Sequence, residues 1–216
     1  MCGRYRNKLS YDQLQRLTKL ALPVAAAGSN MAPALDVRPT TQQWVIRSAE
    51  GGGEALKMRW GLVPYWFKGP TLKEFKLTTF NAKAETVATA ATFKGPFARR
   101  RCLVPADGWY EWTGEKGAKQ RWLFTPTDGE PLTFAGLWER WKPAEGEPVE
   151  SFTIVTQPPG AVLNAYHDRA PVVIWPRDRE RWLTAGEEVE DLIGATAAEC
   201  FNARPITEAE IAAEMA

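Results

Sequence analysis

Hydrophobic and polar residues alternate along many short segments of this chain, which is typical of strands that bury one face. The segments QQWVIR and ALKMRW lie on either side of the glycine-rich stretch EGGGE, so residues 42–60 are expected to form two strands joined by a turn. Further strands are predicted at RCLVP, WYEWT, QRWLFT, LTFAGLW, SFTIVT and PVVIW. The polar stretches GEKGAK and TDGE are predicted to be turns, and KPAEGEPVE an exposed hairpin connection.

Helical periodicity is limited to a few places. In SYDQLQRLTKLAL, one helical face carries Leu14, Leu17 and Ala21, while Ser10 and Gln13 have the spacing of a capping box. Other helices are expected at AETVATAATF, at RDRERWLTA and near the C-terminus. Strands in series with occasional helices predict an antiparallel, β-rich α+β fold. A length of 216 residues without a long linker fits a single domain over residues 1–216.

The composition is that of a soluble globular protein, with 44% hydrophobic and 25% charged residues. Most of the ten tryptophans are therefore expected in the core. A net charge of +1 excludes a whole-molecule field that would attract nucleic acid, so such binding would need local basic patches. Candidate patches are Arg4 with Arg6 and Lys8, Lys57 with Arg59, and the run Arg99, Arg100, Arg101.

The three cysteines, Cys2, Cys102 and Cys200, are odd in number and widely spaced. This pattern favours neither a disulfide framework nor a metal site, and it indicates a reducing compartment. No apolar segment approaches the ~20 residues of a membrane span, and residues 1–30 contain no apolar stretch typical of an export signal. We therefore expect a cytoplasmic protein, in which Cys102 and Cys200 are buried packing residues.

Cys2 differs from the other two cysteines because it directly follows the initiator methionine. Removal of Met1 would leave Cys2 with a free α-amine beside its thiol, and such a 1,2-aminothiol condenses with aldehydes. An α-amine has a pKa of roughly 7.7–8.0, so part of it is neutral and nucleophilic near pH 7. A small second residue also simply permits methionine removal, and an apolar cysteine often only packs. From this stretch alone, packing is the preferred interpretation.

Three polar residues could carry chemistry. His167 is the only histidine, and a lone histidine is more often structural than catalytic. Asp168 beside it would point to the opposite face if the segment is a strand, which disfavours a His–Asp relay. Glu111 lies between aromatic residues, where burial would raise its pKa, although strand alternation could also place it in water. Asn81 precedes a predicted helix, so it could cap that helix or present its amide to a substrate.

Cationic and aromatic residues near these positions could contact nucleic acid. Cations would bind phosphates and exposed rings would stack on unpaired bases. The candidates for phosphate contacts are Arg4, Lys83 and Arg169, and those for base contacts are Pro33, Trp66, Phe67 and Trp112.

Seven motifs occur along the chain in the order MCGRY, RWGLVPYW, NAKAET, RRRCLVPADGWYEW, FAGLWERW, FTIVTQ and HDRAPVVI. With them the sequence resembles the SOS-response-associated peptidase (SRAP) family, from residue 2 to roughly residue 205. The resemblance implies a β-rich domain on a barrel-like sheet, with a positively charged channel for single-stranded DNA. It also implies covalent capture of abasic sites in that DNA.

By this resemblance, Cys2, Asn81, Glu111 and His167 match the residues of the family's reactive site. The Cys2 amine would attack the aldehyde of the opened abasic sugar to give an imine, and its thiol would close a thiazolidine. Glu111 would shuttle protons and allow slow reversal, while His167 would assist ring opening and a β-elimination (lyase) reaction when the thiol is missing. Asn81 would orient the terminus or the sugar.

The resemblance further implies a monomer that needs no cofactor or metal and associates with the nucleoid when bound to DNA. The family's peptidase activity would amount to removal of Met1, which an ordinary aminopeptidase could also perform. Two positions depart from the family's motifs. Lys83 replaces a usual arginine, so a bidentate contact becomes a point charge, and Ala170 replaces a larger residue.

Two other functions remain open at this point. The chain could be an N-terminal-cysteine peptidase or amidohydrolase acting on protein substrates, although no peptide pocket is recognisable in the sequence. It could also be a non-catalytic reader of modified DNA, which would need the basic and aromatic surface but not Cys2. The three functions differ in whether a covalent, Cys2-dependent DNA complex forms.

Overall fold

The computed structural model describes residues 2–18, 32–50, 52–161, 163–186, 188–194 and 200–214. Its larger sheet contains a closed ring of strands, because β10 pairs with both β4 and β9. The order around the ring is β4 (Gly52–Trp60), β3 (Gln42–Ala49), β6 (Arg101–Ala106), β9 (Leu132–Trp141) and β10 (Val149–Gln157). These neighbours are antiparallel except β10 and β4, which are parallel. The β-rich α+β fold with a barrel-like sheet is therefore confirmed.

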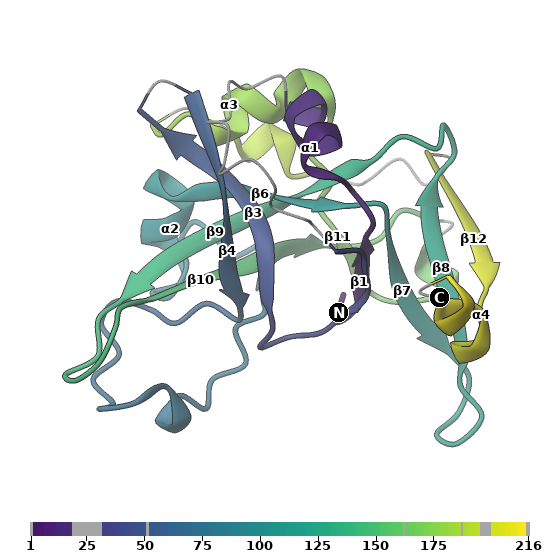
Figure 1. The fold of residues 1–216 in the computed structure, drawn as a ribbon, viewed down its shortest axis with the longest axis horizontal. Coiled ribbons are helices and arrows are strands. Elements are labelled where there is room, and N and C mark those ends of the chain that lie inside the picture. The colour runs from purple at the N-terminus through teal and green to yellow at the C-terminus, as the bar shows by residue number, and fades with distance from the viewer. Residues whose placement is uncertain are drawn as a thin grey trace.

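The second sheet has the strand order β12 (Phe201–Pro205), β8 (Gln120–Pro126), β7 (Gly108–Thr113), β1 (Tyr5–Asn7) and β2 (Ala34–Val37). All of its pairs are antiparallel. In Figure 1, β1 lies between the ring and the strands β7, β8 and β12. Two short strands, β5 (Asn81–Lys83) and β11 (Ala170–Pro171), pair with β10. The chain therefore begins where the two sheets meet.

Aromatic side chains from both sheets share one core. Tyr5 of β1 lies edge-on to Trp60 and Phe134 of the ring, with centroid separations of 5.2 and 5.9 Å. Phe134 also meets Trp109 of β7 at 6.2 Å. Four of the tryptophans, Trp60, Trp109, Trp141 and Trp182, are at most 2% exposed, and five others are partly buried against the core, in agreement with the expected core role. This shared core fixes β1 against the ring.

The helices are short: α1 (Tyr11–Thr18), α2 (Lys94–Arg99), α3 (Arg179–Leu183) and α4 (Glu208–Ala213). Single 3₁₀ turns occur at η1 (Leu72–Glu74), η2 (Leu163–Ala165), η3 (Pro176–Asp178) and η4 (Glu190–Leu192). The predicted capping box of α1 is present, because the Gln13 N–H donates to Ser10 Oγ (3.2 Å) and the Ser10 N–H to Gln13 Oε1 (2.8 Å). Leu14 is buried, as predicted, whereas the Leu17 side chain and Ala21 lie outside the described residues. None of the helices in the described ranges has the length and apolar character needed to cross a membrane.

Two expectations about secondary structure are wrong, and the strand β12 was missed. The segment AETVATAATF forms successive turns, and the helix begins only at Lys94. Its β-branched residues are poor helix formers, and Val87 is its only fully buried side chain. In PVVIW, only Pro171 belongs to a strand, and Val173 forms a single bridge with Phe134. FNARP alternates apolar and polar residues, but it is only five residues long and ends in a proline, and the strand β12 that it forms was not predicted.

Candidate active site around Cys2

Cys2 lies beside β7 because of the register of β1. Tyr5 pairs with Trp109, and the Tyr110 N–H donates to the Arg4 carbonyl at 3.0 Å. In an antiparallel pair, residues before Tyr5 run beside residues after Trp109, so Cys2 approaches Glu111. Cys2 is fully buried, with its Sγ 4.0 Å from the Arg4 carbonyl oxygen. Burial, reinforced by the negative charge of Glu111, raises the pKa of the Cys2 thiol.

Asn81 holds the Cys2 backbone. It lies in β5, opposite Ile154 of β10, and its Nδ2 donates to the Cys2 carbonyl at 3.0 Å. Its Oδ1 is buried without a hydrogen-bond partner in the structure. The alternative that Asn81 caps a helix is wrong, since the residue lies in a strand that no helix follows directly. The Asn81 side chain therefore connects β5 to the chain start, and its Oδ1 is available to accept a further hydrogen bond.

Glu111 is a buried acid without a cationic partner among the ion pairs of the described residues. It lies on β7 opposite Trp122, and it is 4% exposed. Its Oε1 has no hydrogen-bond partner. Burial, with a smaller contribution from the charge of Asp168, raises the pKa of Glu111 to about 8. The alternative that strand alternation places Glu111 in water is therefore wrong, and the carboxyl is protonated at neutral pH.

His167 is brought to the same strands by its neighbour Tyr166. The Tyr166 ring packs edge-on against Trp122 and Phe124 of β8, at 5.0 and 5.1 Å between centroids. Because Trp122 is the cross-strand partner of Glu111, this packing holds the His167 segment over the strand that carries the acid. The role of Tyr166 was not predicted. Its only signal in the sequence is that it directly precedes His167.

The segment at His167 is irregular and not a strand, so His167 and Asp168 do not have to point to opposite faces. His167 Nδ1 lies 2.8 Å from Asp168 Oδ1 and also accepts the Arg169 N–H at 3.0 Å. The backbone donor suits the neutral ring and the carboxylate suits the protonated ring. Burial lowers the pKa of His167, while Asp168 opposes that shift. The neutral ring is therefore favoured at pH 7, with a carboxylate ready to pair with an added proton.

Two of the three predicted phosphate-binding cations are paired with carboxylates. Arg4 Nη1 contacts both oxygens of Asp36, at 2.5 and 2.8 Å. Arg169 forms a bidentate pair with Glu85, and hydrogen bonds from Arg169 are the main reason that the pKa of Glu85 falls to about 2. Lys83 is exposed and lies two residues from Asn81 on β5, so both side chains are on one face of that strand.

The aromatic candidates differ in accessibility. Pro33 is exposed and Trp66 is 37% exposed. Tyr65, which was not predicted, is 65% exposed, and its position next to Trp66 was its only signal in the sequence. Phe67 is half-buried against Phe75 and Trp141, at 5.1 and 5.3 Å between ring centroids. The Phe67 ring therefore packs the loop of residues 61–80 against Trp141 and is less available for stacking on a base than Trp66.

Trp112 is half-buried, and the guanidinium groups of Arg4 and Arg121 lie 5.8 and 5.0 Å from its ring. The prediction that Arg6 and Arg101 contribute to basic surface patches is wrong, because both side chains are buried and already bonded within the protein. Arg6 pairs with Asp107, and Arg101 donates to backbone carbonyls, including that of Trp182 at 2.6 Å.

The other two cysteines belong to the hydrophobic core. Cys102 is fully buried in β6, as predicted. Cys200 packs against the edge of the core, as predicted, but it is only half-buried. Within the described ranges, no group of three or more His, Cys, Asp or Glu residues is arranged to hold a metal ion.

A sequence model described as "SOS response associated peptidase (SRAP)" matches residues 1–211. The chain belongs to the SRAP family. Among relatives of this SRAP chain, the abasic site processing protein YoqW of Bacillus subtilis (strain 168) is 29% identical over 184 residues, covering 85% of the chain and 80% of that protein. The abasic site processing protein HMCES of Rattus norvegicus is 29% identical over 230 residues, covering 87% and 65%.

A solved structure also matches the SRAP chain over almost its whole length. A protein from Bordetella bronchiseptica has a TM-score of 0.82 with 27% sequence identity, covering 95% of this chain and 100% of that one. A phage-related protein from the same organism has a TM-score of 0.73 with 26% identity, covering 96% and 95%. The arrangement of the two sheets is therefore shared with other chains of known structure.

Proposed function

We propose that this chain processes abasic sites in single-stranded DNA by forming a covalent bond through Cys2. One observation carries the proposal: the chain start is held by Asn81 beside a buried, unpaired acid, Glu111. A terminus that served only for packing would need neither group. The names of the relatives YoqW and HMCES, both abasic site processing proteins, support the choice of substrate.

The chemistry follows from the 1,2-aminothiol that removal of Met1 leaves at Cys2. After Met1 is removed, the neutral Cys2 amine attacks C1′ of the opened sugar, and loss of one water from the adduct gives an imine. The thiol sulfur then adds to the imine carbon, and the thiol proton ends on the nitrogen. The product is a five-membered thiazolidine that links the protein to the sugar. A chain that keeps Met1 would be inactive, because an acylated amine cannot form the imine.

Glu111 and His167 are suited to the two proton transfers. Glu111 is protonated at neutral pH, so it can donate a proton to the departing hydroxyl and accept it again later. The neutral His167 ring can take a proton during ring opening, with Asp168 placed to stabilise the cation at 2.8 Å. Asn81 keeps the Cys2 carbonyl in place while its free Oδ1 accepts a hydrogen bond from the amine or the sugar.

A gel experiment tests this function. Met1-free protein is incubated with a single-stranded oligonucleotide that carries one abasic site, then heated in denaturant and resolved beside Cys2→Ala and Cys102→Ala. We expect a heat-stable shifted band for the wild type and for Cys102→Ala, and none for Cys2→Ala. Cys2→Ala keeps the amine, so it should instead cleave the strand by β-elimination. A Cys2-independent shift that disappears on heating would contradict the proposal and indicate a reader of modified DNA.

A further inference from the structure

The strand that delivers Cys2 has little backbone pairing of its own. β1 is three residues long, and its pairing with β2 is irregular between Tyr5 and Asn7. Its pairing with β7 consists of the register Tyr5 with Trp109 and Arg6 with Gly108. A slip by one residue would move Cys2 by ~3.3 Å along β7 and turn the side chains of β1 to the other face. The buried Tyr5 ring opposes such a slip from the core side, and a second set of contacts to β1 opposes it from outside the core.

Asp107 contacts β1 in three ways, directly before β7 begins. Its N–H donates to the Arg6 carbonyl at 3.1 Å, its Oδ1 accepts the Lys8 N–H at 3.0 Å, and its Oδ2 accepts the Arg6 Nε–H at 2.8 Å. The two backbone contacts are possible only in the observed register. The Arg6 side chain, 5% exposed, is in turn held by Glu214 Oε2 at 2.8 Å.

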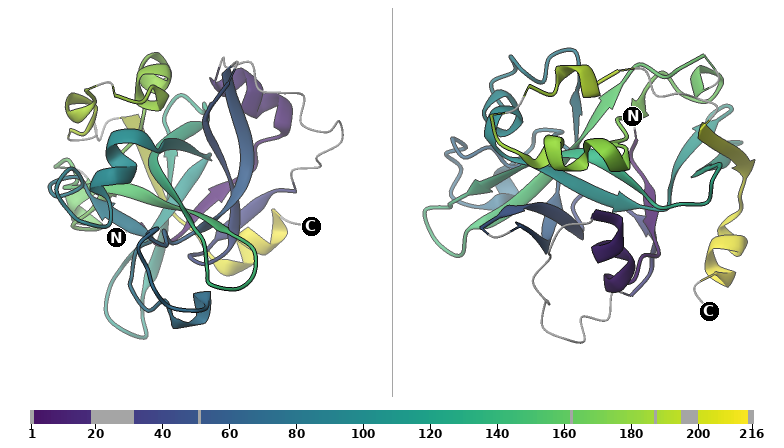
Figure 2. Two further views of the ribbon diagram at one scale, coloured as in Figure 1. Left: turned by 90° about the vertical axis from the view of Figure 1, so that its left-hand side faces the viewer. Right: turned by 90° about the horizontal axis from the view of Figure 1, so that it is seen from above.

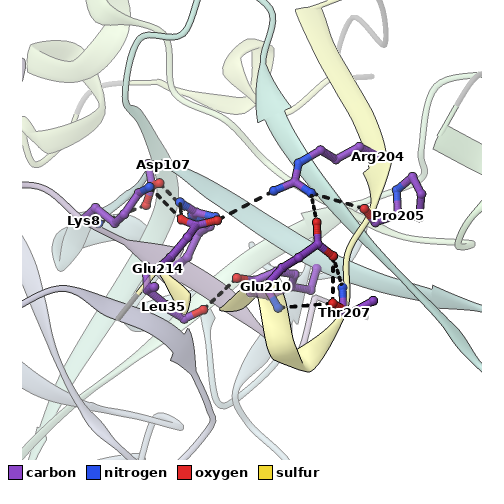
Figure 3. A network of polar contacts seen from close by, with 10 residues as sticks. Lys8, Leu35, Asp107, Arg204, Pro205, Thr207, Glu210 and Glu214 are labelled. Carbon is purple, nitrogen blue, oxygen red and sulfur yellow. Dashed lines mark hydrogen bonds and ion pairs between the residues drawn. The ribbon is translucent and has the colours of Figure 1, made fainter. Parts of the chain in front are cut away.

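Asp107, Arg6 and Lys8 form a polar clamp on β1, and Glu214 connects this clamp to the C-terminal helix. Its carboxylate also accepts from Lys8 Nζ at 2.9 Å and lies 3.7 Å from Arg204, as Figure 3 shows. α4 is itself fixed by the Thr207 capping box and by the buried side chain of Ile211. The helix lies at the far end of the molecule from the β9–β10 hairpin tip (Figures 1 and 2). The clamp thus braces β1 from outside the ring.

We propose that Asp107 is a positioning residue for Cys2, because it locks the register of β1 on β7 and so keeps the chain start beside Glu111 and Asn81. This inference rests on the proposed capture reaction. It does not place Asp107 at the reacting atoms, since its carboxylate is occupied by Arg6 and Lys8. Asp107 contributes by placing the Cys2 nucleophile. A displacement of a nucleophile by about 1 Å can slow a reaction ~10²-fold.

The test separates placement from DNA binding. Crosslinking of the Met1-free chain to an abasic single strand is followed at saturating DNA, and affinity is measured separately with an oligonucleotide carrying a tetrahydrofuran, which has no aldehyde. For Asp107→Ala, we expect the saturating rate constant to fall by about tenfold or more with unchanged tetrahydrofuran affinity. Asp107→Asn keeps an acceptor for the Lys8 N–H, so it should recover part of the rate.

Asp128→Ala is the matched control, because the Asp128 carboxylate also accepts a backbone N–H in a turn, from Glu130 at 3.0 Å, without contact to β1. It should keep the wild-type rate. A wild-type rate in Asp107→Ala overturns the inference alone, as does an equal loss of rate and affinity. If Asp107→Ala does not fold, Asp107→Asn decides by the same comparison. Absence of any wild-type crosslink overturns the proposed function and this inference together.

Discussion

Glu111 and Glu139 are equally buried, each 4% exposed on a strand, but their surroundings differ. Glu139 of β9 accepts from Arg100 at 2.5 Å and from the Arg140 N–H at 3.0 Å. Glu111 of β7 lies among aromatic residues beside the start of the chain and has an oxygen without a hydrogen bond. A buried carboxyl without a hydrogen-bond partner is costly to ionise, which raises the pKa of Glu111, whereas Glu139 has a cation beside it.

The same contrast separates the two fully buried cysteines. Burial raises the pKa of both thiols. Cys102 lies in the ring wall, where Gly136 leaves room for its sulfur, since a Cβ there would lie 2.7 Å from Sγ. Cys2 lies instead among polar groups that the ring and β7 supply. Burial alone therefore does not distinguish a reactive residue from a packing residue, whereas its polar neighbours do.

The largest expected effect comes from removing the acid at Glu111. Glu111→Gln should slow crosslink formation by ~10²-fold, because general acid–base catalysis is lost while the shape is kept. Reversal of the crosslink should slow as well. Glu139→Gln is the control, and it should keep the crosslinking rate but lose about 1–2 kcal/mol of stability, because it leaves the partly exposed Arg100 without its partner. Equal rates for the two variants would contradict the contrast between the two glutamates.

The second prediction concerns pH. The folded-state pKa of Glu111, about 8, exceeds its unfolded value near 4.3, so the native state binds an extra proton between those two pH values. The contribution of this group to stability is thus full below about pH 4 and is lost as pH rises towards 8, by up to about 1.4 kcal/mol per pH unit. Urea unfolding at pH 5 and pH 8.5 should show a larger loss of stability for the wild type than for Glu111→Gln. An equal loss in both proteins would contradict the raised pKa.

Asn81→Ala tests whether the contact with the Cys2 carbonyl serves capture or folding. We expect the crosslinking rate to fall by about tenfold, since Cys2 loses the hydrogen bond that the Asn81 side chain donates to its carbonyl. The melting temperature should change little, because no helix depends on this residue. Asn202→Ala, at an exposed position of β12, should leave both quantities unchanged. A collapsed melting temperature with normal crosslinking in the folded fraction would show that Asn81 is only structural.

Much of the fold follows from local patterns in the sequence. Alternation located the ring strands and β7 and β8, and the spacing of Ser10 and Gln13 located the start of α1. The closure of the ring was beyond such reasoning, because the parallel pairing of β10 with β4 joins segments about ninety residues apart. The turns at AETVATAATF were misjudged because periodicity was given more weight than the many β-branched residues.

The site was predicted less completely. The motifs pointed to Cys2, Asn81, Glu111 and His167, but local reasoning left each with a structural alternative. Each alternative depended on the secondary structure assumed at one residue. For example, a strand was assumed at Asp168, where the structure has a bend. The carboxylate partners of Arg4 and Arg169 come from distant segments, so the sequence could not reveal that these cations are already paired.

The smallest effect is expected at Lys83. Lys83 is exposed on the same face of β5 as Asn81, and a point charge there gives one phosphate contact. Lys83→Ala should lower the salt dependence of binding to a tetrahydrofuran oligonucleotide, with the slope of log K against log salt falling by about 0.7. Lys83→Arg can form a bidentate contact, so it should tighten binding by less than about tenfold. Lys57→Ala, at an exposed ring position beside Trp44, is the control and should leave the slope unchanged. If Lys57→Ala changes the slope as much as Lys83→Ala, the single-stranded DNA does not bind preferentially at the face of β5 that carries Asn81 and Lys83.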